Sequence, residues 1–342
     1  MEIKAFLEAP DGWDRFVNEH KNGKIYHSTV WNEMVKTTFG HQIYYITLTE
    51  NQKITGVLPL TDFKSLLFGR LAVSQPFVNY GGPLLSNDDQ IEPLMQFLES
   101  FRVEKGFKSI EIRQGEALDT GKPCKQHKVT FFLDLPADPD ELFNGFKAKL
   151  RSQIRRPMKD EMTGKTGGLE LLDEFYKVFT INMRDLGTPP LPRRFFENIL
   201  KTFPEEAFVG VVYAANGDAA AASFLIKYGD IMEIPWASSL REYNRSSPNM
   251  LLYWESLKLS IEKGCKRFDY GRCTPDSGTY RFKKQWGAEE SPLYWYYILP
   301  EKEELPEMNP DNSKFDMFIK IWQKMPLSFT NSVGPLVIKH IP

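Results

Sequence analysis

The alternation of apolar and polar positions predicts a β-hairpin in each half of the chain. The first hairpin pairs YYITLTE with ITGVLPL across a polar turn at Asn51, and the second pairs FVGVVYA with AAASFLI across a turn at Asn216. Short apolar runs separated by a polar bend are typical of two antiparallel strands. Another apolar segment follows each hairpin, so we expect a third strand in each half.

A helix is predicted next in each half, because apolar residues recur there every three or four positions. The two stripes are Ile91, Leu94, Phe97, Leu98 and Phe101, and Leu251, Trp254, Leu257 and Ile261. The helices lead into two similar segments, EKGFKSIEI and EKGCKRFDY, in which Gly106 and Gly264 are placed to adopt a left-handed backbone at the helix end. This internal repeat predicts hairpin, strand, helix and strand twice, with the strands on either side of each helix parallel.

The chain length and the repeat together predict two domains. A chain of 342 residues is longer than one ordinary core requires. An acidic turn and a basic run separate the repeats, so we place the boundary near Leu135, with domains at residues 1–135 and 136–300. Residues 301–342 begin with the acidic, proline-rich EKEELPEMNPDN and are predicted to be a linker and a C-terminal tail. The predicted fold class is α/β, with two mixed sheets flanked by helices.

Composition and charge limit the class of protein. The chain is 42% apolar and 26% charged, as folded proteins are, and its 43 basic and 45 acidic residues give no overall field that would attract polyanions. A partner that carries phosphate therefore needs a local basic patch. The N-terminus lacks the basic start and apolar run of a signal peptide, and no transmembrane segment is expected. These features predict a cytoplasmic protein.

The sequence contains few signs of a metal or a tightly bound cofactor. The three cysteines have no CxxC spacing, and His27 and His41 have no third ligand at metal spacing, so we interpret both histidines as structural. HExxH, GxSxG, Walker A and GxGxxG motifs are absent from the sequence. We therefore expect no metal site and no tightly bound cofactor.

The predicted helix of the second half begins near Ser246 to Asn249. Ser247 is a candidate N-cap and Pro248 suits the first turn, which would leave backbone N–H groups free to bind phosphate or carboxylate. Helix capping alone is the alternative explanation. Arg245, Ser247 and Asn249 are candidate donor-binding residues, because the preceding loop holds more polar groups than a cap requires.

Residues 268–287 hold the densest mixture of charged, aromatic and glycine residues. Transfer of an acyl group to an amine needs a base or a water relay for the ammonium proton, and positive donors for the carbonyl oxygen and donor phosphates. Asp269 or Glu233 is the candidate base. The candidate donors are Arg272, Tyr280, Lys283 and Lys284. The alternative is that the carboxylates are salt-bridged and the lysines solvated.

A basic run precedes the second half. It comprises Lys147, Lys149, Arg151, Arg155, Arg156 and Lys159. Lys147, Arg151 and Arg155 share one helical face, which is suited to a nucleic-acid backbone or a pyrophosphate. A solvated helix is the alternative.

Four segments, FGHQIYYI, PFVNYGGPL, IPWASSLREYNRSSPNMLLYWE and DYGRCTPDSGTYRFKKQWGA, carry a family resemblance over nearly the whole chain. They resemble the FemAB-like transferases, whose halves are each similar to the GNAT acyltransferase fold. The resemblance is closest to the branch associated with exosortase and exopolysaccharide gene clusters. It implies two tandem GNAT-like domains and aminoacyl transfer from aminoacyl-tRNA to an amine of a bacterial peptidoglycan or exopolysaccharide precursor. Lys283 and Lys284, before Trp286-Gly287, match the catalytic lysine segment.

The resemblance also has consequences for the rest of the site. Trp236 and Ser238 of the third motif join the candidate binding residues, and Asn79 and Tyr80 are predicted walls of a cleft between the repeats. The chain lacks the helical arm of some FemAB members and the Q/R-x-x-G-x-G/A loop of ordinary GNAT enzymes. The co-substrate is therefore aminoacyl-tRNA or acyl-CoA, and a non-catalytic binding or assembly module is a third hypothesis.

The predicted tail mixes apolar and basic residues. Its apolar members are Phe315, Phe318, Ile319, Ile321 and Trp322. Such a stripe is suited to peripheral contact with the inner face of the cytoplasmic membrane. The alternative is that it packs on its own domain.

Overall fold

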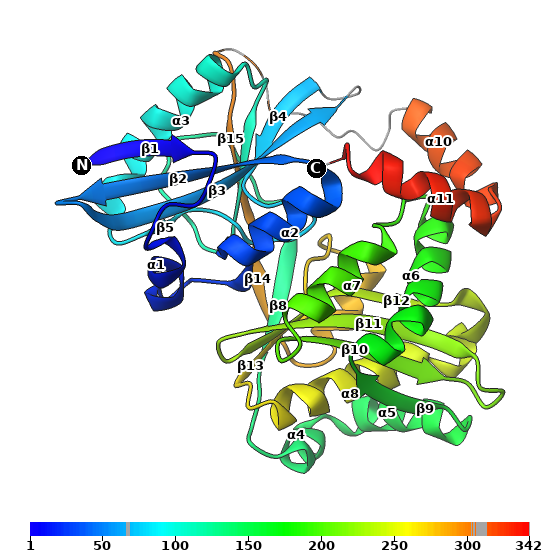
Figure 1. The fold of residues 1–342 in the computed structure, drawn as a ribbon. Helices are drawn as coiled ribbons and strands as arrows, with labels where there is room; N and C mark the ends of the chain where they lie inside the picture. Colours follow the sequence, from blue (N-terminus) through cyan, green and yellow to red (C-terminus); the bar gives the residue numbers. More distant parts are fainter. Residues whose placement is uncertain (66–68, 302, 304, 306–312, 342) are drawn as a thin grey trace. The chain divides into compact units, whose positions relative to one another are not determined.

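The computed structural model describes residues 1–65, 69–301, 303, 305 and 313–341, which fold into two compact units (Figure 1). The first unit comprises Met1–Val129, Pro292–Met308 and Lys339–Pro342, and the second comprises Thr130–Ser291 and Asn309–Ile338. Each unit contains its own sheet.

The first unit is built on a sheet of eight strands in the order β1-β2-β3-β4-β6-β15-β7, with β5 paired to β3. Within the described residues, neighbouring strands of this sheet are antiparallel except β4 and β6, which are parallel. The strands are β1 (Glu2–Phe6), β2 (Gln42–Glu50), β3 (Lys53–Ser65), β4 (Gly69–Val73), β5 (Leu84–Leu85), β6 (Ile110–Gln114), β7 (Cys124–Lys125) and β15 (Tyr294–Ile298).

The predicted order of hairpin, strand, helix and strand is confirmed in the first unit. β2 and β3 form the hairpin, and α3 connects β4 to the parallel β6. Leu94, Leu98 and Phe101 of α3 are buried in one core with apolar residues of the sheet. Gly106 ends the helix with the predicted left-handed backbone, at φ 69°. The helices of this unit are α1 (Trp13–Glu19), η1 (Ile25–His27), α2 (Thr29–Phe39), η2 (Asp88–Gln90) and α3 (Ile91–Lys105).

The second unit repeats this order on a sheet of seven strands, β14-β8-β13-β12-β11-β10-β9. β10 and β11 form the hairpin, and α8 connects β12 to the parallel β13. Gly264, two residues after α8, has φ 73°, so the second predicted left-handed glycine is also confirmed. The strands are β8 (Val129–Asp134), β9 (Thr163–Gly167), β10 (Ala207–Tyr213), β11 (Ala219–Tyr228), β12 (Ile231–Ser239), β13 (Arg267–Asp269) and β14 (Glu289–Pro292).

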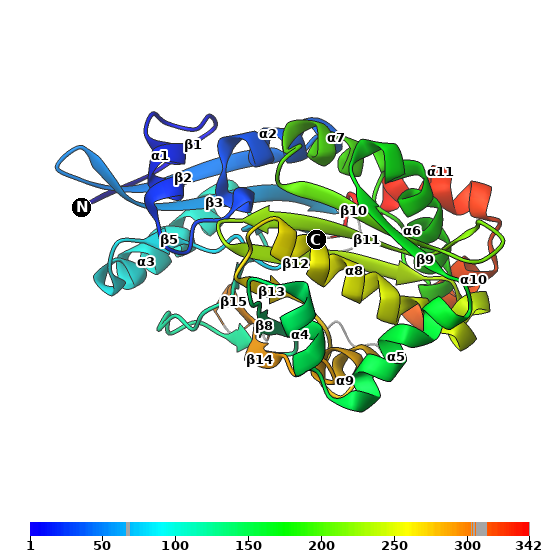
Figure 2. The same cartoon turned by 90° about the horizontal axis from the view of Figure 1, so that it is seen from below.

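Helices cover both faces of the second sheet (Figure 2). α6 and α7 lie on one face, where rings of Phe175 and Phe196 contact Phe224 of β11. α8 lies on the other face, with α5 beside it. The helices are α4 (Pro139–Gly145), α5 (Ala148–Lys159), η3 (Leu169–Leu171), α6 (Leu172–Leu186), α7 (Arg193–Thr202), η4 (Arg241–Ser246), α8 (Pro248–Glu262), α9 (Gly278–Lys284), α10 (Ser313–Lys324) and α11 (Leu327–Ile338).

The chain passes between the units at positions other than the expected boundary near Leu135. β8 precedes that boundary, yet it pairs with β13 in the second sheet. β15, which the sequence places before residue 300 in the second half, pairs with β6 and β7 in the first sheet. A strand pairs with the free edge of another strand that can be distant in sequence, and the periodicity within one segment does not predict which strand that is.

The residues after 300 form two helices where the structure describes them. Residues 302, 304 and 306–312 of the predicted linker lie outside the described residues. α10 and α11 follow, and both contact α6 of the second unit. None of the helices that the structure describes is long and apolar enough to cross a membrane.

Candidate functional site in the second unit

The site begins where the parallel strands β12 and β13 stop pairing. Their last paired residues are Glu233 and Asp269. Just beyond, the register between β11 and β12 shifts, so that Ile234 and Pro235 together oppose one residue of β11. Such a bulge bends a strand and redirects its side chains. The carboxyl ends of parallel strands are also where α/β sheets usually bind ligands.

Asp269 holds the turn that follows β13. Its carboxylate is fully buried and accepts hydrogen bonds from the Gly271 N–H, at 2.8 Å, and from the Thr130 hydroxyl. Gly271 adopts φ 67°, and a Cβ atom there would lie 2.7 Å from the Ile234 carbonyl oxygen. The turn therefore requires glycine both for its backbone conformation and for its close approach to β12.

Lys283 of α9 binds the carbonyl groups of the same turn. The Lys283 side chain is only 3% exposed, and its Nζ donates to the carbonyl oxygens of Gly271 at 2.7 Å and Arg272 at 3.0 Å. Burial lowers the pKa of Lys283 to about 8, although the nearby carboxylates of Asp269 and Glu233 oppose that shift. A buried amine with a depressed pKa beside a strand end is typical of functional sites.

This pKa predicts how stability depends on pH. The unfolded state keeps the Lys283 proton up to its ordinary pKa of 10.5, whereas the folded state releases it near 8. The unfolded state therefore binds more protons within that window, and the free energy of unfolding should rise with pH there by about 3 kcal/mol. Lys283→Met is the comparison, because the contributions of all other titrating groups to the pH dependence are common to both proteins and cancel in the difference. Denaturant unfolding at pH values from 7 to 11 gives the free energy of unfolding of each protein. If the two free energies changed with pH in the same way, the lowered pKa of Lys283 would be contradicted.

Aromatic contacts position α9 against α8. The Phe282 ring lies 4.9 Å from that of Tyr253, which in turn stacks on Tyr270 at 5.6 Å. Ser277 caps the start of α9 by accepting the Tyr280 N–H at 3.1 Å. These contacts bring the residues on either side of Lys283 next to the start of α8.

The two adjacent lysines have different environments. Lys284 is exposed, and its Nζ lies 3.5 Å from the Tyr280 hydroxyl. That hydroxyl also donates to Glu290, a hydrogen bond that raises the pKa of Tyr280. Lys284 and Tyr280 thus lie on the outer side of α9, whereas Lys283 lies inside.

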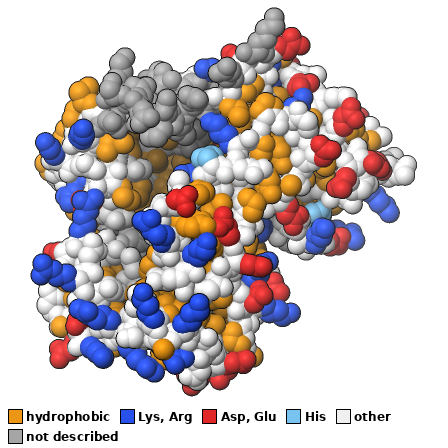
Figure 3. Space-filling view, turned by 180° about the vertical axis from the view of Figure 1, so that it is seen from behind, with side chains coloured by type: hydrophobic (Ala, Val, Ile, Leu, Met, Phe, Trp, Pro, Cys, Tyr) orange, Lys and Arg blue, Asp and Glu red, His pale blue; other side chains and the backbone are white. Residues whose placement is uncertain are grey.

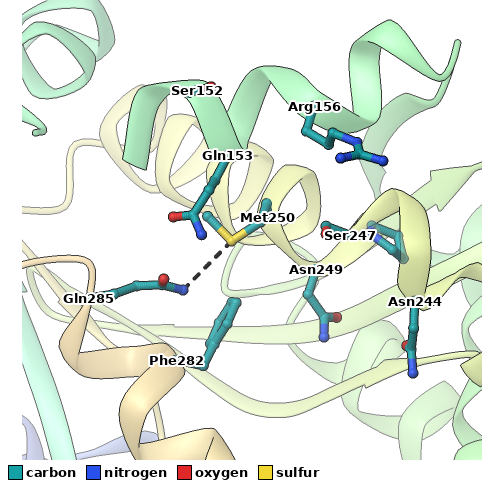
Figure 4. A pocket seen from close by; sticks show the side chains of 10 residues that line it. Ser152, Gln153, Arg156, Asn244, Ser247, Asn249, Met250, Phe282 and Gln285 are labelled. Atoms are coloured by element: carbon teal, nitrogen blue, oxygen red, sulfur yellow. Dashed lines mark hydrogen bonds between the residues drawn. The ribbon is translucent and has the colours of Figure 1, made fainter. Parts of the chain in front are cut away.

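A cavity of about 500 Å³ opens where α5, α8 and α9 meet (Figure 4). Three groups of residues line it: Ser152, Gln153 and Arg156 from α5; Asn244, Ser247, Pro248, Asn249 and Met250 around the start of α8; and Phe282 and Gln285 at the end of α9. None of these ten described residues is acidic, and Arg156 supplies a positive charge. The N-terminal end of α8, a helix of 15 residues, adds partial positive charge. The cavity is therefore suited to an anionic group.

The start of α8 agrees only partly with its prediction. Ser247 occupies the N-cap position and Pro248 the first turn, as expected. The Ser247 side chain makes no capping hydrogen bond, however, so that part of the prediction is wrong. Its backbone is left-handed, with φ 56°, whereas a capping serine usually has an extended backbone that turns its hydroxyl toward the N–H groups.

The remaining predicted residues of the second unit are dispersed. Trp236 packs on Phe195 and Phe196 of α7, and Ser238 accepts a hydrogen bond from Asn182 of α6 at 3.2 Å, so both lie on the sheet face opposite α8. The other two are exposed. They are Arg245 in η4 and Arg272 in the turn after β13.

Two predicted residues belong to the first unit. Asn79 and Tyr80 are both buried, and the Lys24 ammonium lies 4.5 Å from the centre of the Tyr80 ring. Their contribution to the site stays a prediction. His27 of the same unit is also buried, with its Nε2 3.0 Å from the Gly82 carbonyl oxygen, and burial lowers its pKa to about 4. Within the described ranges, no group of three or more His, Cys, Asp or Glu residues could hold a metal ion.

The cavity also contains residues that sequence reasoning did not place in the site. Among them are Ser152, Gln153, Arg156, Asn244, Phe282 and Gln285. Arg156 belongs to the basic run, but the sequence singled out Arg155, which instead stacks on Phe143 at 4.9 Å. The spacing of Ser152, Gln153 and Arg156 is that of one helical face, and this was the only signal available.

A family comparison gives a match over the part of the chain that contains this site. Residues 146–284 match the family described as acetyltransferase (GNAT) domain. The match contains the β12 bulge, the Asp269 turn, Lys283 and nine of the ten cavity residues, all except Gln285. This part of the second unit is therefore similar to a GNAT acetyltransferase domain. None of the curated proteins matches the sequence.

Solved structures extend the likeness to most of the chain. FemX is 18% identical with a TM-score of 0.65, covering 86% of this chain and 97% of that one. L-PGS from Bacillus licheniformis is 14% identical with a TM-score of 0.57, covering 93% and 98%. A tandem GNAT protein from the clavulanic acid biosynthesis pathway is 12% identical with a TM-score of 0.53, covering 87% and 99%. At these identities the likeness shows the fold, and the predicted mixed α/β fold of two GNAT-like units is confirmed.

Proposed function

We propose that this protein is an acyltransferase that forms an amide on an amino group, with its active site in the second unit. The proposal rests on one observation: the GNAT match contains both a cavity whose lining includes Arg156 and no acidic residue, and the buried amine of Lys283. The donor's anionic group would occupy the cavity. The reacting carbonyl would lie toward the turn after β13.

The donor is proposed to be aminoacyl-tRNA. The α5 helix that lines the cavity also exposes Lys149, Arg155 and Lys159, which are suited to a nucleic-acid backbone. Lys and Arg side chains gather on the part of the second unit seen in Figure 3. The sequence resemblance to the FemAB-like transferases favours this donor and a peptidoglycan or exopolysaccharide precursor as acceptor, and the likeness of the fold to FemX agrees with a cell-wall precursor.

Acyl-CoA is the second candidate donor, since one cavity of about 500 Å³ at a helix N-terminus also suits a pyrophosphate. The two donors are separated by incubating the full chain and an amine acceptor with charged tRNAs or with a panel of acyl-CoAs, and measuring amide product. Amide from charged tRNA alone supports the first donor. If neither donor gives product, a non-catalytic binding module becomes the better explanation.

The chemistry assigns different tasks to the buried groups. The acceptor nitrogen attacks the carbonyl carbon, a C–N bond forms, the C–O or C–S bond to the donor breaks, and the ammonium proton passes through water to the leaving group. Two N–H groups of Lys283 are held by carbonyls, and the third is proposed to stabilise the developing oxyanion. The carboxylates of Asp269 and Glu233 favour the charged form of Lys283.

Two adjacent arginines test the location of the donor. Arg156→Gln removes the positive charge of the cavity and should weaken donor binding at least about tenfold, because a hydrogen bond to a charged group contributes about 1.5–3 kcal/mol. Arg155→Gln removes the same charge from a side chain that stacks on Phe143, and a smaller loss is expected. Titration of each variant with donor measures the effect. A larger loss in Arg155→Gln would place the donor outside the cavity.

A further inference from the structure

Exposed apolar side chains are concentrated at the end of the second unit. Of the thirteen large hydrophobic residues that are exposed within the described ranges, five belong to α10 and α11. They are Met317, Phe318, Ile321, Phe329 and Leu336. A sixth, Leu186, ends α6 beside α10, since Gln323 of α10 donates to the carbonyl oxygen of Asp185 at 3.0 Å. Concentration of this kind marks an interaction surface more often than scattered exposure does.

The opposite sides of the two helices are already packed on their own unit. Trp322 is buried, and Ile319 lies so close to Gly187 that a Cβ atom there would be 2.5 Å from its side chain. α11 buries Thr330, Gly334 and Ile338 at a spacing of four residues. Because these inner faces make the contacts with α6, the exposed apolar side chains form a separate outer surface.

Cations are interspersed with the apolar residues of that outer surface. Met317, Ile321 and Lys324 follow one another at helical spacing on α10, and Lys320 lies on the same face. Both charged side chains that the structure describes on α10 are thus positive, and the α11 sequence has no ionisable residue. Protein interfaces are depleted in lysine. Helices that lie on anionic lipid combine aromatic and aliphatic residues with lysines that extend toward the headgroups.

We propose that α10 and α11, with Leu186, form a surface that binds an anionic lipid bilayer peripherally. Phe318, Ile321 and Met317 would enter the boundary between headgroups and acyl chains, and Lys320 and Lys324 would contact the anionic headgroups. This surface binds lipid whichever donor or acceptor the second unit uses, so it stands independently of the proposed transfer reaction.

Vesicle flotation of the full chain tests the surface. The protein should float with vesicles of phosphatidylcholine mixed with phosphatidylglycerol, and much less with phosphatidylcholine alone. Phe318→Ser combined with Ile321→Ser should weaken binding to the anionic vesicles at least roughly tenfold, because two apolar side chains no longer enter the bilayer. Lys320→Gln combined with Lys324→Gln should remove most of the preference for the anionic vesicles.

The matched control is Val103→Ser, which changes an apolar side chain that is 68% exposed on α3 of the first unit. It should float as the wild type does. All of the changed residues are exposed, and circular dichroism verifies that the variants fold. The proposal is overturned by a wild type that does not float, by an equal loss in Val103→Ser, or by sedimentation showing that the Phe318/Ile321 pair instead holds two copies of the chain together.

Discussion

Replacing Lys283 by methionine is expected to slow acyl transfer by a factor of about 10²–10³, the usual loss when one donor to a developing oxyanion is removed. Methionine has a similar length and fills the buried space, but it cannot donate to the carbonyls of Gly271 and Arg272 or to the reacting oxygen. Single-turnover transfer from the donor that supports activity measures the loss. Because donor binding involves the cavity instead, donor affinity should change little.

Lys284→Met is the matched comparison, because Lys284 is the exposed neighbour on the same helix. Its ammonium contacts the Tyr280 hydroxyl on the outer side of α9, so we expect a smaller loss. The sequence motif does not show which of the two lysines is catalytic. The variant with the larger loss of transfer rate identifies it. Equal transfer rates in Lys283→Met and the wild type would show that Lys283 has a structural role only and does not take part in the reaction.

Gly271→Ala is expected to lower the free energy of unfolding by about 3 kcal/mol, since it combines a strained left-handed backbone with overpacking. The added methyl group would lie 2.7 Å from the Ile234 carbonyl oxygen, which belongs to the backbone of β12 and cannot move as a side chain does. Relief of this contact would separate β12 from the turn and displace the carbonyl that holds Lys283. Denaturant unfolding gives the size of the effect.

Gly264→Ala is the control for the cost of placing alanine in a left-handed backbone conformation. Gly264 has φ 73°, close to the 67° of Gly271, but no atom lies within 4 Å of the position that its Cβ would take. The alanine there should cost only the conformational strain, about 1 kcal/mol. The difference between the two variants measures the contact with β12. Equal losses in the two variants would mean that the turn after β13 moves away from β12 at no cost in stability.

Much of the fold could be predicted because its repeat is local. The stripe of Leu94, Leu98 and Phe101 and the glycine at 106 are determined within one helix and its end. The parallel pairing of β12 with β13 follows from the helix between them. The partners of β8 and β15 could not be predicted in the same way, since each joins strands that are distant in sequence.

The site was predictable as a region but not as a set of contacts. The segment after β13 attracts attention by composition, and it does contain the turn that Lys283 holds. Whether Trp236 faces α7 or α8 depends on the bulge at Ile234 and Pro235, because one extra residue reverses the faces of the following side chains. Arg156 reaches the cavity only because α5 packs beside α8, which no local pattern records.

The position of β15 has a consequence for the order in which the protein is made. β15 lies between β6 and β7 in the first sheet, yet it is translated after the whole of Thr130–Ser291. During synthesis, the earlier strands of the first unit therefore emerge with a vacant place beside β6, while the second unit has all seven strands of its sheet by residue 292. The half of the chain that leaves the ribosome first must complete its sheet last, which makes the nascent first unit the part most in need of protection from aggregation.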